Sequence, residues 1–86
     1  MPNYTAKIII MPVKELLDPQ GKTVANNMQH LHISGVQDVR IGKHIEMLLS
    51  ASNETEAENI VDESCKKLLA NLITETYTYK VVPVNN

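Results

Sequence analysis

The stretch Leu16-Leu17-Asp18-Pro19-Gln20-Gly21-Lys22 marks the point where an apolar segment gives way to a polar one. Asp18 is a favourable helix N-cap, because its carboxylate can accept backbone N–H groups that have no partner in the first helical turn. Pro19 suits the first helical position, where its missing N–H costs nothing and its φ is already helical. The stretch therefore predicts that a strand ends before it and a helix begins at it.

The segments on either side agree with that division. Tyr4 to Val13 is β-branched and apolar, with consecutive isoleucines at Ile8–Ile10, which predicts a central strand covered on both faces. After the cap, apolar residues recur at helical spacing. These residues are Val24, Ala25, Met28 and Leu31. Gly35 can supply the positive φ of a helix exit or turn, so we expect the first helix to end shortly before it.

Two further strands are predicted in the middle of the chain, over Val36–Ile41 and Lys43–Ser50. Gly42 lies between them and is a natural bend between antiparallel partners. The apolar residues that share one face of the second strand are Ile45, Met47 and Leu49. Leu48 makes the other face of that strand only partly polar, and the alternation in the first strand is weaker.

A second helix is expected to open at Ser52 and Asn53, where Asn53 and Glu56 resemble a capping box. One stripe of this helix recurs at three- and four-residue steps, the strongest periodicity in the chain. Its residues are Ala57, Ile60, Val61, Ser64, Cys65, Leu68 and Leu69. We expect the helix to stop near Asn71 and a last strand, rich in Thr, Tyr and Val, to run from Glu75 to Val84.

The order strand, helix, strand, strand, helix, strand predicts one α+β domain over residues 1–86. Right-handed crossovers place both helices on one face of a four-stranded antiparallel sheet, the ferredoxin-like βαββαβ sandwich. The other face then lacks helices and exposes residues such as Leu48 or half of the Ile8–Met11 run. We therefore expect copies of the chain to associate through that face or along a sheet edge.

Composition excludes several classes of function. The chain has 86 residues, a formal net charge of -2 and one cysteine. A slightly acidic protein has no long-range attraction for nucleic acid or anionic membranes, and no segment approaches the roughly twenty apolar residues of a membrane span. A single cysteine cannot form an internal disulfide, so a core this small is expected to gain stability by association. We expect a soluble cytoplasmic protein.

The groups that could carry chemistry favour structural roles. Cys65 lies mid-helix on the inward stripe, where a packed core thiol is favoured over a nucleophile. His30 and His32 do not face one another on a helix, so surface roles for these residues and for His44 are favoured over a metal site. No nucleophile, base and orienting acid occur at a recognisable spacing. We predict no catalytic, cofactor-binding or metal-binding residues.

Gly21 and Gly42, with Lys22 and Lys43 beside them, could be phosphate-binding turns. A helix start and a hairpin bend are favoured instead, because the glycine spacing of a P-loop or a dinucleotide fingerprint is missing. RNA-binding proteins of this fold stack bases on aromatic residues of the middle strands. The predicted middle strands hold no Tyr, Phe or Trp, so RNA binding is disfavoured.

The chain resembles the PurS family, the small subunit of bacterial and archaeal phosphoribosylformylglycinamidine (FGAM) synthase. The resemblance rests on LLDPQGK at 16–22, on GVQDVRIGK at 35–43, on CKKLLAN at 65–71, and on Glu75 and Tyr77 at the start of the last strand. The chain departs from the family pattern at Val13-Lys14-Glu15, where a glycine-bearing turn is common, and at His44 and Leu72.

The resemblance implies a subunit without an active site that bridges a PurQ-like glutaminase and a PurL-like, ATP-dependent synthetase. It also implies a homodimer or tetramer, and a complex that uses ATP, Mg and glutamine while this subunit binds no cofactor. Our hypothesis is that two loops meet the partner subunits. The contact residues would be Leu17, Gln20, Lys22, Arg40 and Lys43, and the structural caps would be Asp18, Pro19, Gly21 and Gly42.

Two alternatives share the predicted topology. A regulatory module would bind an amino acid or nucleotide at a subunit interface, and would bind this effector without any partner protein. An acyl-phosphate hydrolase of this fold would need an arginine in the loop after the first strand. The chain has no arginine between Met11 and Lys22, which disfavours the hydrolase.

Overall fold

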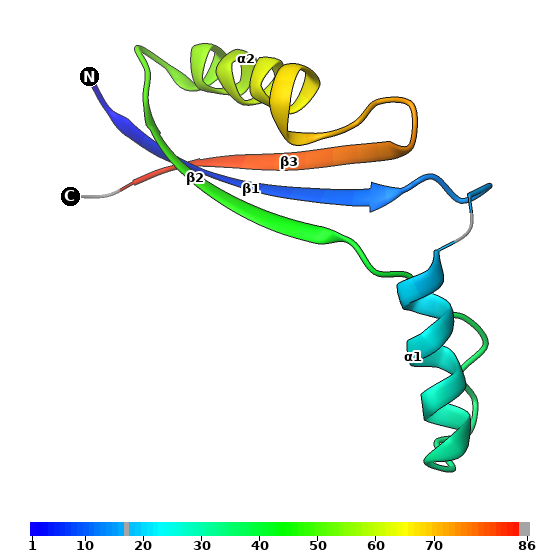
Figure 1. Ribbon diagram of the computed structural model, residues 1–86. Coiled ribbons are helices and arrows are strands. Elements are labelled where there is room, and N and C mark those ends of the chain that lie inside the picture. The colour runs from blue at the N-terminus through cyan, green and yellow to red at the C-terminus, as the bar shows by residue number, and fades with distance from the viewer. Residues whose placement is uncertain (17, 85–86) are drawn as a thin grey trace.

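The computed structural model describes residues 1–16 and 18–84. In chain order its elements are β1 (Asn3–Pro12), α1 (Pro19–His30), β2 (Lys43–Ser50), α2 (Glu54–Ser64), the π-helical turn η1 (Cys65–Leu69) and β3 (Glu75–Pro83) (Figure 1). Among the described residues, no helix has the length and apolar character needed to cross a membrane.

The described strands form a three-stranded antiparallel sheet in the order β2-β1-β3. Ile8 of β1 lies opposite Ile45 of β2 on one side and Tyr79 of β3 on the other. The run of β-branched residues thus occupies the central strand, as the sequence predicts, because such side chains suit a pleated surface with neighbours on both sides. The fold is α+β.

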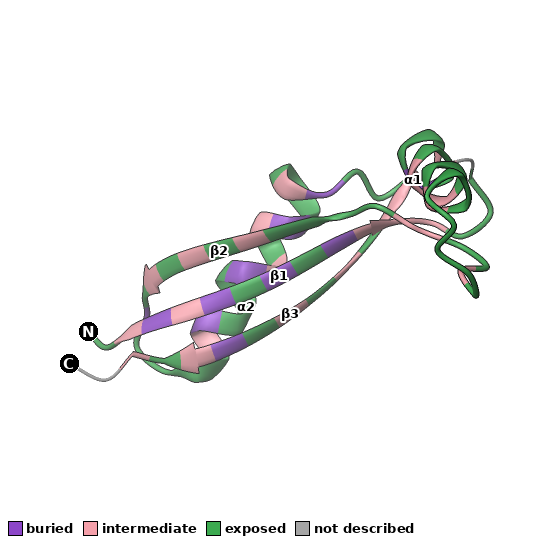
Figure 2. Ribbon diagram, turned by 90° about the horizontal axis from the view of Figure 1, so that it is seen from below, coloured by how far each residue is buried: buried purple, intermediate pink, exposed green. Residues whose placement is uncertain are grey.

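The core lies between one face of the sheet and α2. Every second residue of β1 from Tyr4 to Ile10 is buried, and α2 lies against the sheet (Figure 2). The start of η1 adds to this layer. The β1 residues are Tyr4, Ala6, Ile8 and Ile10, and the helical residues are Ala57, Val61 and Cys65. The inner stripe predicted for the second helix is therefore confirmed at these three positions.

The opposite face of the sheet carries no helix. Ile9 is 47% exposed there and Leu48 is 71% exposed, so the prediction that both faces of the first strand are covered is wrong. Lys7 lies on the same face, opposite Glu46 of β2 and Lys80 of β3. The result is a mixed surface of apolar and charged side chains, because α2, the helix that packs on the sheet, covers the other face.

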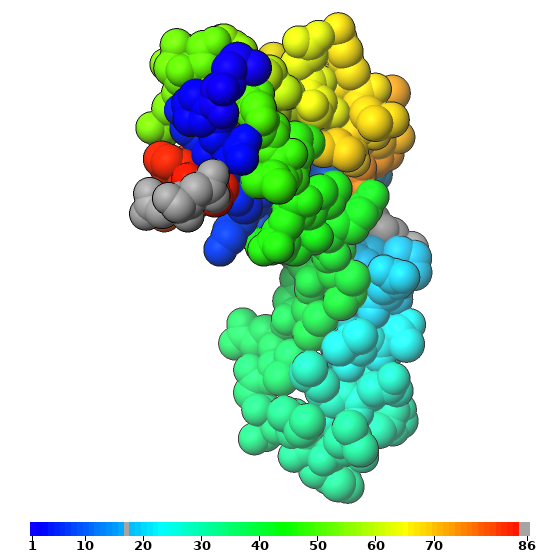
Figure 3. Space-filling view, turned by 90° about the vertical axis from the view of Figure 1, so that its left-hand side faces the viewer, coloured from blue at the N-terminus to red at the C-terminus, as the bar shows by residue number. Residues whose placement is uncertain are grey.

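The other helix, α1, lies beyond the ends of β1 and β2 (Figures 1 and 3). Residues 19–38, hereafter the arm, give the molecule principal extents of 52 × 30 × 14 Å. Its radius of gyration is 16.8 Å, whereas a compact domain of this length has about 12 Å. The only buried residue of α1 is Gly21. The arm therefore makes almost no apolar core with the rest of its own chain.

The strand predicted over Val36–Ile41 does not form, and so the four-stranded sheet is not found in the described residues. The backbone N–H of Ile41 donates to the Asp18 carboxylate at 2.8 Å instead of joining a strand ladder. Gly42 is consequently not a hairpin bend. It lies against β1, where an added Cβ would meet the carbonyl oxygen of Ile10 at 2.4 Å.

The second helix departs from the prediction near its end. Its start follows the expected pattern, since the Asn53 side chain accepts from the Glu56 N–H at 2.8 Å. The α-helix ends at Ser64, however, and η1 continues it with wider turns to Leu69. An extra residue per turn rotates the stripe. Leu68 is consequently 83% exposed rather than packed in the core.

Candidate functional site

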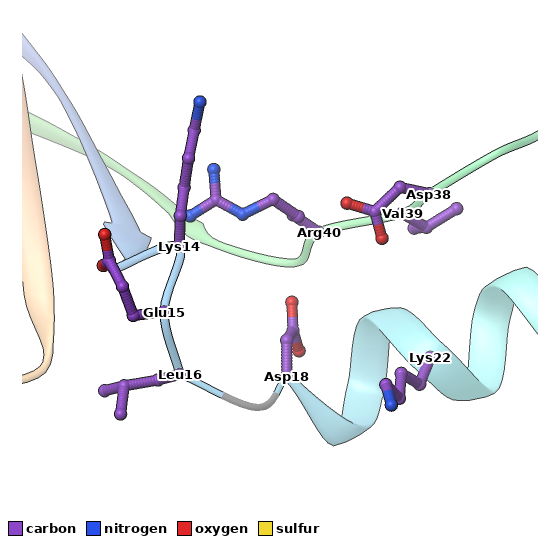
Figure 4. A pocket seen from close by; sticks show the side chains of 8 residues that line it. All are labelled: Lys14, Glu15, Leu16, Asp18, Lys22, Asp38, Val39 and Arg40. Atoms are coloured by element: carbon purple, nitrogen blue, oxygen red, sulfur yellow. The ribbon is translucent and has the colours of Figure 1, made fainter.

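The arm meets the sheet at a joint, which we define as Pro12, Asp18, Gly21 and residues 39–42. The chain leaves the sheet after β1 and returns to it at β2, and β1 and β2 are antiparallel neighbours with Ile10 opposite Lys43. The two connections are therefore held side by side. Figure 4 shows the joint, with the Asp18 carboxylate directed toward the segment that carries Arg40.

Asp18 links both sides of the joint. It is the N-cap of α1, and its Oδ1 accepts from the Gly21 N–H at 3.0 Å. Its Oδ2 accepts from the Ile41 N–H at 2.8 Å. The hydrogen bond from Gly21, then that from Ile41 and the nearby charge of Arg40, lower the pKa of the Asp18 carboxyl. The carboxylate is thus ionised at neutral pH and occupied on both oxygens by backbone donors.

Two glycines allow the segments to approach closely. A Cβ on Gly21 would lie 2.1 Å from the carbonyl oxygen of Val39. A Cβ on Gly42 would lie 2.3 Å from the Met11 sulfur. Neither position leaves room for a side chain, so glycine is required for the returning segment to lie against both α1 and β1.

Two basic residues, Arg40 in the joint and Lys43 directly after it, bind other parts of the chain. The Arg40 guanidinium donates to the carbonyl oxygen of Pro12, which is the last residue of β1. Lys43 forms an ion pair with Glu75 at 3.5 Å, across to the start of β3. The Glu75 carboxylate also accepts from the Asn71 N–H at 2.8 Å. Arg40 and Lys43 therefore already have partners within the chain, although the Lys43 side chain remains 61% exposed.

Several hollows surround the joint. The first, of about 390 Å³, has three basic and three acidic side chains among its lining residues. Its lining consists of Lys14, Glu15, Leu16, Asp18, Lys22, Asp38, Val39 and Arg40. The second, of about 290 Å³, includes Gln20, Lys43 and Glu75. The third, of about 520 Å³, lies beside α1 and includes Thr23, Val24 and Ile41. The equal numbers of basic and acidic side chains around the first hollow do not favour a phosphate ligand.

Comparisons with known proteins decide the family. A family model described as "PurS: Phosphoribosylformylglycinamidine (FGAM) synthase" matches residues 5–83. The PurS subunit from Bacillus subtilis is 38% identical over 81 residues, covering 94% of this chain and 95% of that protein. A crystal structure of PurS from Methanocaldococcus jannaschii has a TM-score of 0.85 at 34% identity, covering 95% of this chain and 99% of that one.

The chain belongs to the PurS family. PurS is a subunit of FGAM synthase, a glutamine-using ligase complex of purine biosynthesis. The resemblance seen in the sequence is thereby confirmed. Two of its motifs, LLDPQGK and GVQDVRIGK, come together at the joint, since Asp18 of the first binds the Ile41 N–H of the second. Much of what makes this sequence resemble PurS is thus concentrated where the arm meets the sheet.

The structure brings together four of the predicted contact residues. Gln20, Lys22, Arg40 and Lys43 line the hollows of the joint. Leu17 lies outside the described residues. Sequence reasoning missed Lys14, Glu15 and Leu16, which line the first hollow. The antiparallel pairing of the first and third elements could have indicated them, because it places both connections at the same end of the sheet.

Two candidate chemical groups of this PurS-family chain, Cys65 and His32, lie away from the joint. Cys65 is fully buried, and desolvation, with a smaller effect of the Asp62 charge, raises the pKa of its thiol. A core thiol, as predicted, is therefore confirmed. His32 has a φ of 61° at the tip of the arm. In the part of the chain that the structure describes, no group of three His, Cys, Asp or Glu residues could hold a metal ion.

A second polar cluster joins α2 to β3. The Tyr77 hydroxyl donates to Asp62 at 2.7 Å, and Lys66 pairs with the same carboxylate at 2.9 Å. These two hydrogen bonds, that of Tyr77 foremost, lower the pKa of Asp62. The same hydrogen bond raises the pKa of Tyr77 to about 12. The cluster fastens the helix to the edge strand.

Proposed function

We propose that this chain is the non-catalytic subunit of FGAM synthase that holds a PurQ-like glutaminase and a PurL-like synthetase in register. The observation that carries the proposal is the family match over residues 5–83. It is supported by similarity to a chain in a structure of PurLQS from Thermotoga maritima, with a TM-score of 0.89 at 28% identity and coverage of 95% and 100%.

The chemistry of the complex explains why such a subunit is needed. Ammonia released from glutamine would diffuse away or be protonated in bulk water, so the site that makes it and the site that uses it must be kept together. In this proposal the complex, rather than this subunit, uses ATP, Mg and glutamine, and it is located in the cytoplasm. The buried thiol and the charge-balanced hollows of this chain suit a structural role.

The proposal includes a homodimer or tetramer that forms through the sheet. The arm lies off its own sheet, and α2 alone packs on the covered face. An arm from a second copy could therefore lie beside α2 and supply the second helix of the ferredoxin-like arrangement predicted from the sequence. Exposed apolar residues such as Ile9 and Leu48 support association through the other face as well.

The surface that meets the two enzymes is proposed to be the outside of the joint. Its contact residues would be Leu17, Gln20, Lys22, Arg40 and Lys43. The exposed polar rim of the joint is the kind of surface that gives specificity in protein assemblies. Asp18, Pro19, Gly21 and Gly42 would shape this surface without contacting the partners.

The test is reconstitution with the glutaminase and synthetase subunits. We expect the wild-type chain to form one complex with both and to support glutamine-dependent FGAM formation. An Arg40→Ala/Lys43→Ala variant should require at least a tenfold higher concentration for assembly, while its unfolding transition is retained. The complex can be measured by analytical ultracentrifugation.

The matched control removes two positive charges elsewhere. Lys66→Ala/Lys67→Ala removes two ion pairs of α2 and η1, those with Asp62 and Glu63, and exposed pairs of this kind contribute little to stability. The Tyr77 hydrogen bond to Asp62 stays in place, so this variant should assemble normally. Equal assembly by the joint variant and the wild type would rule out the proposed contacts. A wild-type chain that joins neither enzyme would rule out the bridging role itself.

A further inference from the structure

The arm is attached to the sheet through polar contacts rather than through an apolar core. Asp18 joins the start of α1 to Ile41, and Arg40 joins the returning segment to Pro12 at the end of β1. Gly21 lets the carbonyl of Val39 pack directly against α1. These contacts tie together the two connections through which the arm leaves and rejoins the sheet.

The arm does not take the placement that the sequence order alone would suggest for α1. In a single-chain ferredoxin-like fold, the first helix turns back and packs beside the second helix on the sheet. That placement requires the chain to reverse direction between Pro12 and Pro19. Here Asp18 and Arg40 hold the beginning and the end of the arm together at the end of the sheet, and the arm points away from the sheet (Figures 1 and 3).

We propose that Asp18, Arg40 and Gly21 form a clamp that keeps the arm off the sheet of its own chain. The arm then remains available to a second copy. All three residues position the arm for assembly. Asp18 and Gly21 do so without touching a partner, whereas Arg40 is also one of the contact residues proposed above. This inference rests on the homo-oligomer proposed above, but the position of the arm within one chain can be measured separately from the mass of the assembly.

The substitution Asp18→Asn separates the role of this residue in the clamp from its role as the N-cap of α1. Asparagine is as good an N-cap as aspartate, and its single acceptor oxygen can still serve the Gly21 N–H. Its amide NH₂ would then face the Ile41 N–H, so two donors would meet where the carboxylate now accepts. The variant should therefore keep α1 and open the clamp.

A second variant opens the clamp in another way. Gly21→Ala places a Cβ against the Val39 carbonyl and pushes the returning segment away, while alanine favours the helix itself. The matched control is Asp38→Asn. Asp38 lines the first hollow of the joint, as Asp18 does. It makes no side-chain hydrogen bond or ion pair within the described residues.

The experiment measures the distance between nitroxide labels at Gln29→Cys on α1 and Thr55→Cys on α2, in a Cys65→Ala background. Dilution with unlabelled chain restricts the signal to pairs within one molecule. We expect a narrow distribution at long distance for the wild type and for Asp38→Asn. Asp18→Asn and Gly21→Ala should give broad or shortened distributions with unchanged helical circular dichroism, and a self-association constant at least tenfold weaker.

Each result decides one part of the inference. A narrow, long distance that persists in both clamp variants would overturn the clamp. Normal self-association by a variant whose arm has moved would overturn its role in assembly. A wild-type chain that sediments as a monomer would refute the homo-oligomer, while the distances would still decide whether the clamp positions the arm.

Discussion

The two ends of this molecule are held together by different forces. In the sheet half, apolar side chains of β1 are buried against α2 and η1. In the arm, α1 buries only Gly21, and the joint relies on the Asp18 carboxylate, the Arg40 guanidinium and close backbone packing. The sheet half is therefore held mainly by apolar contacts. The arm has a defined direction but almost no core, which is expected of an element that is completed by another chain.

The largest expected change in stability comes from substitutions in β1, whose two faces lie in different environments. Ile8 is fully buried against α2, whereas its neighbour Ile9 is half exposed on the helix-free face. Ile8→Ala should lower the free energy of unfolding by about 2–5 kcal/mol, because it leaves a cavity in the core. Ile9→Ala should cost less than about 1 kcal/mol in the isolated monomer.

Urea unfolding of both variants measures this difference, at concentrations below self-association. An equal loss in the two variants would mean that the helix-free face is covered in the isolated chain as well. The division between a covered and an open sheet face would then be wrong.

The next largest change in stability comes from alanine substitutions of two glycines, one at the joint and one at the tip of the arm. Gly42→Ala forces a Cβ against the Ile10 carbonyl and the Met11 sulfur, and overpacking of this kind costs about 1–3 kcal/mol. Gly35 has a φ of 90° and open space around it, so Gly35→Ala should cost about 1–2 kcal/mol through backbone strain alone.

Hydrogen exchange locates the two losses. Gly42→Ala should speed exchange at the end of β1 and the start of β2, whereas Gly35→Ala should speed exchange only in the arm. Faster exchange throughout the sheet in Gly35→Ala would show that the arm and the sheet unfold as one unit.

The sequence predicts those elements whose residues carry their own local signals. Asp18 and Pro19 start α1, Asn53 starts α2, and Lys43–Ser50 is β2 as expected. Each of these predictions depends on a cap or a periodicity that lies within a few residues. The family, too, is recognisable from short motifs, and the comparisons confirm it.

What the sequence does not reveal is set by contacts between distant residues. The segment Val36–Ile41 alternates like a strand, but its last N–H is taken by Asp18, 23 positions away. The π-helical turn that exposes Leu68 follows a stripe that is regular in the sequence. The approach of Val39 to Gly21 likewise cannot be read from either glycine motif alone, because each is locally a normal turn or helix start.

The smallest expected change in stability comes from the ionisable contacts, which differ between the sheet half and the arm. Tyr77→Phe removes the hydrogen bond that does most to lower the pKa of Asp62. A carboxyl whose pKa is lowered in the folded state stabilises the fold above its unfolded pKa, near 3.8, and this stability is lost as pH falls through the folded pKa. The variant should therefore be less stable than the wild type at neutral pH, and its stability should fall less steeply on acidification.

At alkaline pH the ionisation of Tyr77 makes the stability of the wild type fall as the pH rises. The Tyr77 pKa of about 12 lies above its ordinary value of 10.0, so the wild type should lose stability between these pH values, because the unfolded chain releases the proton first. Tyr77→Phe should lack that loss. The lowered pKa of Asp18 at the joint depends on Gly21 and Ile41 instead, so acid should still release the arm in this variant. The free energy of unfolding measured across pH tests the contact in the sheet half, and the distance between the nitroxide labels tests the joint. An unaltered pH profile in Tyr77→Phe would show that the contact between Asp62 and Tyr77 does not stabilise the sheet half.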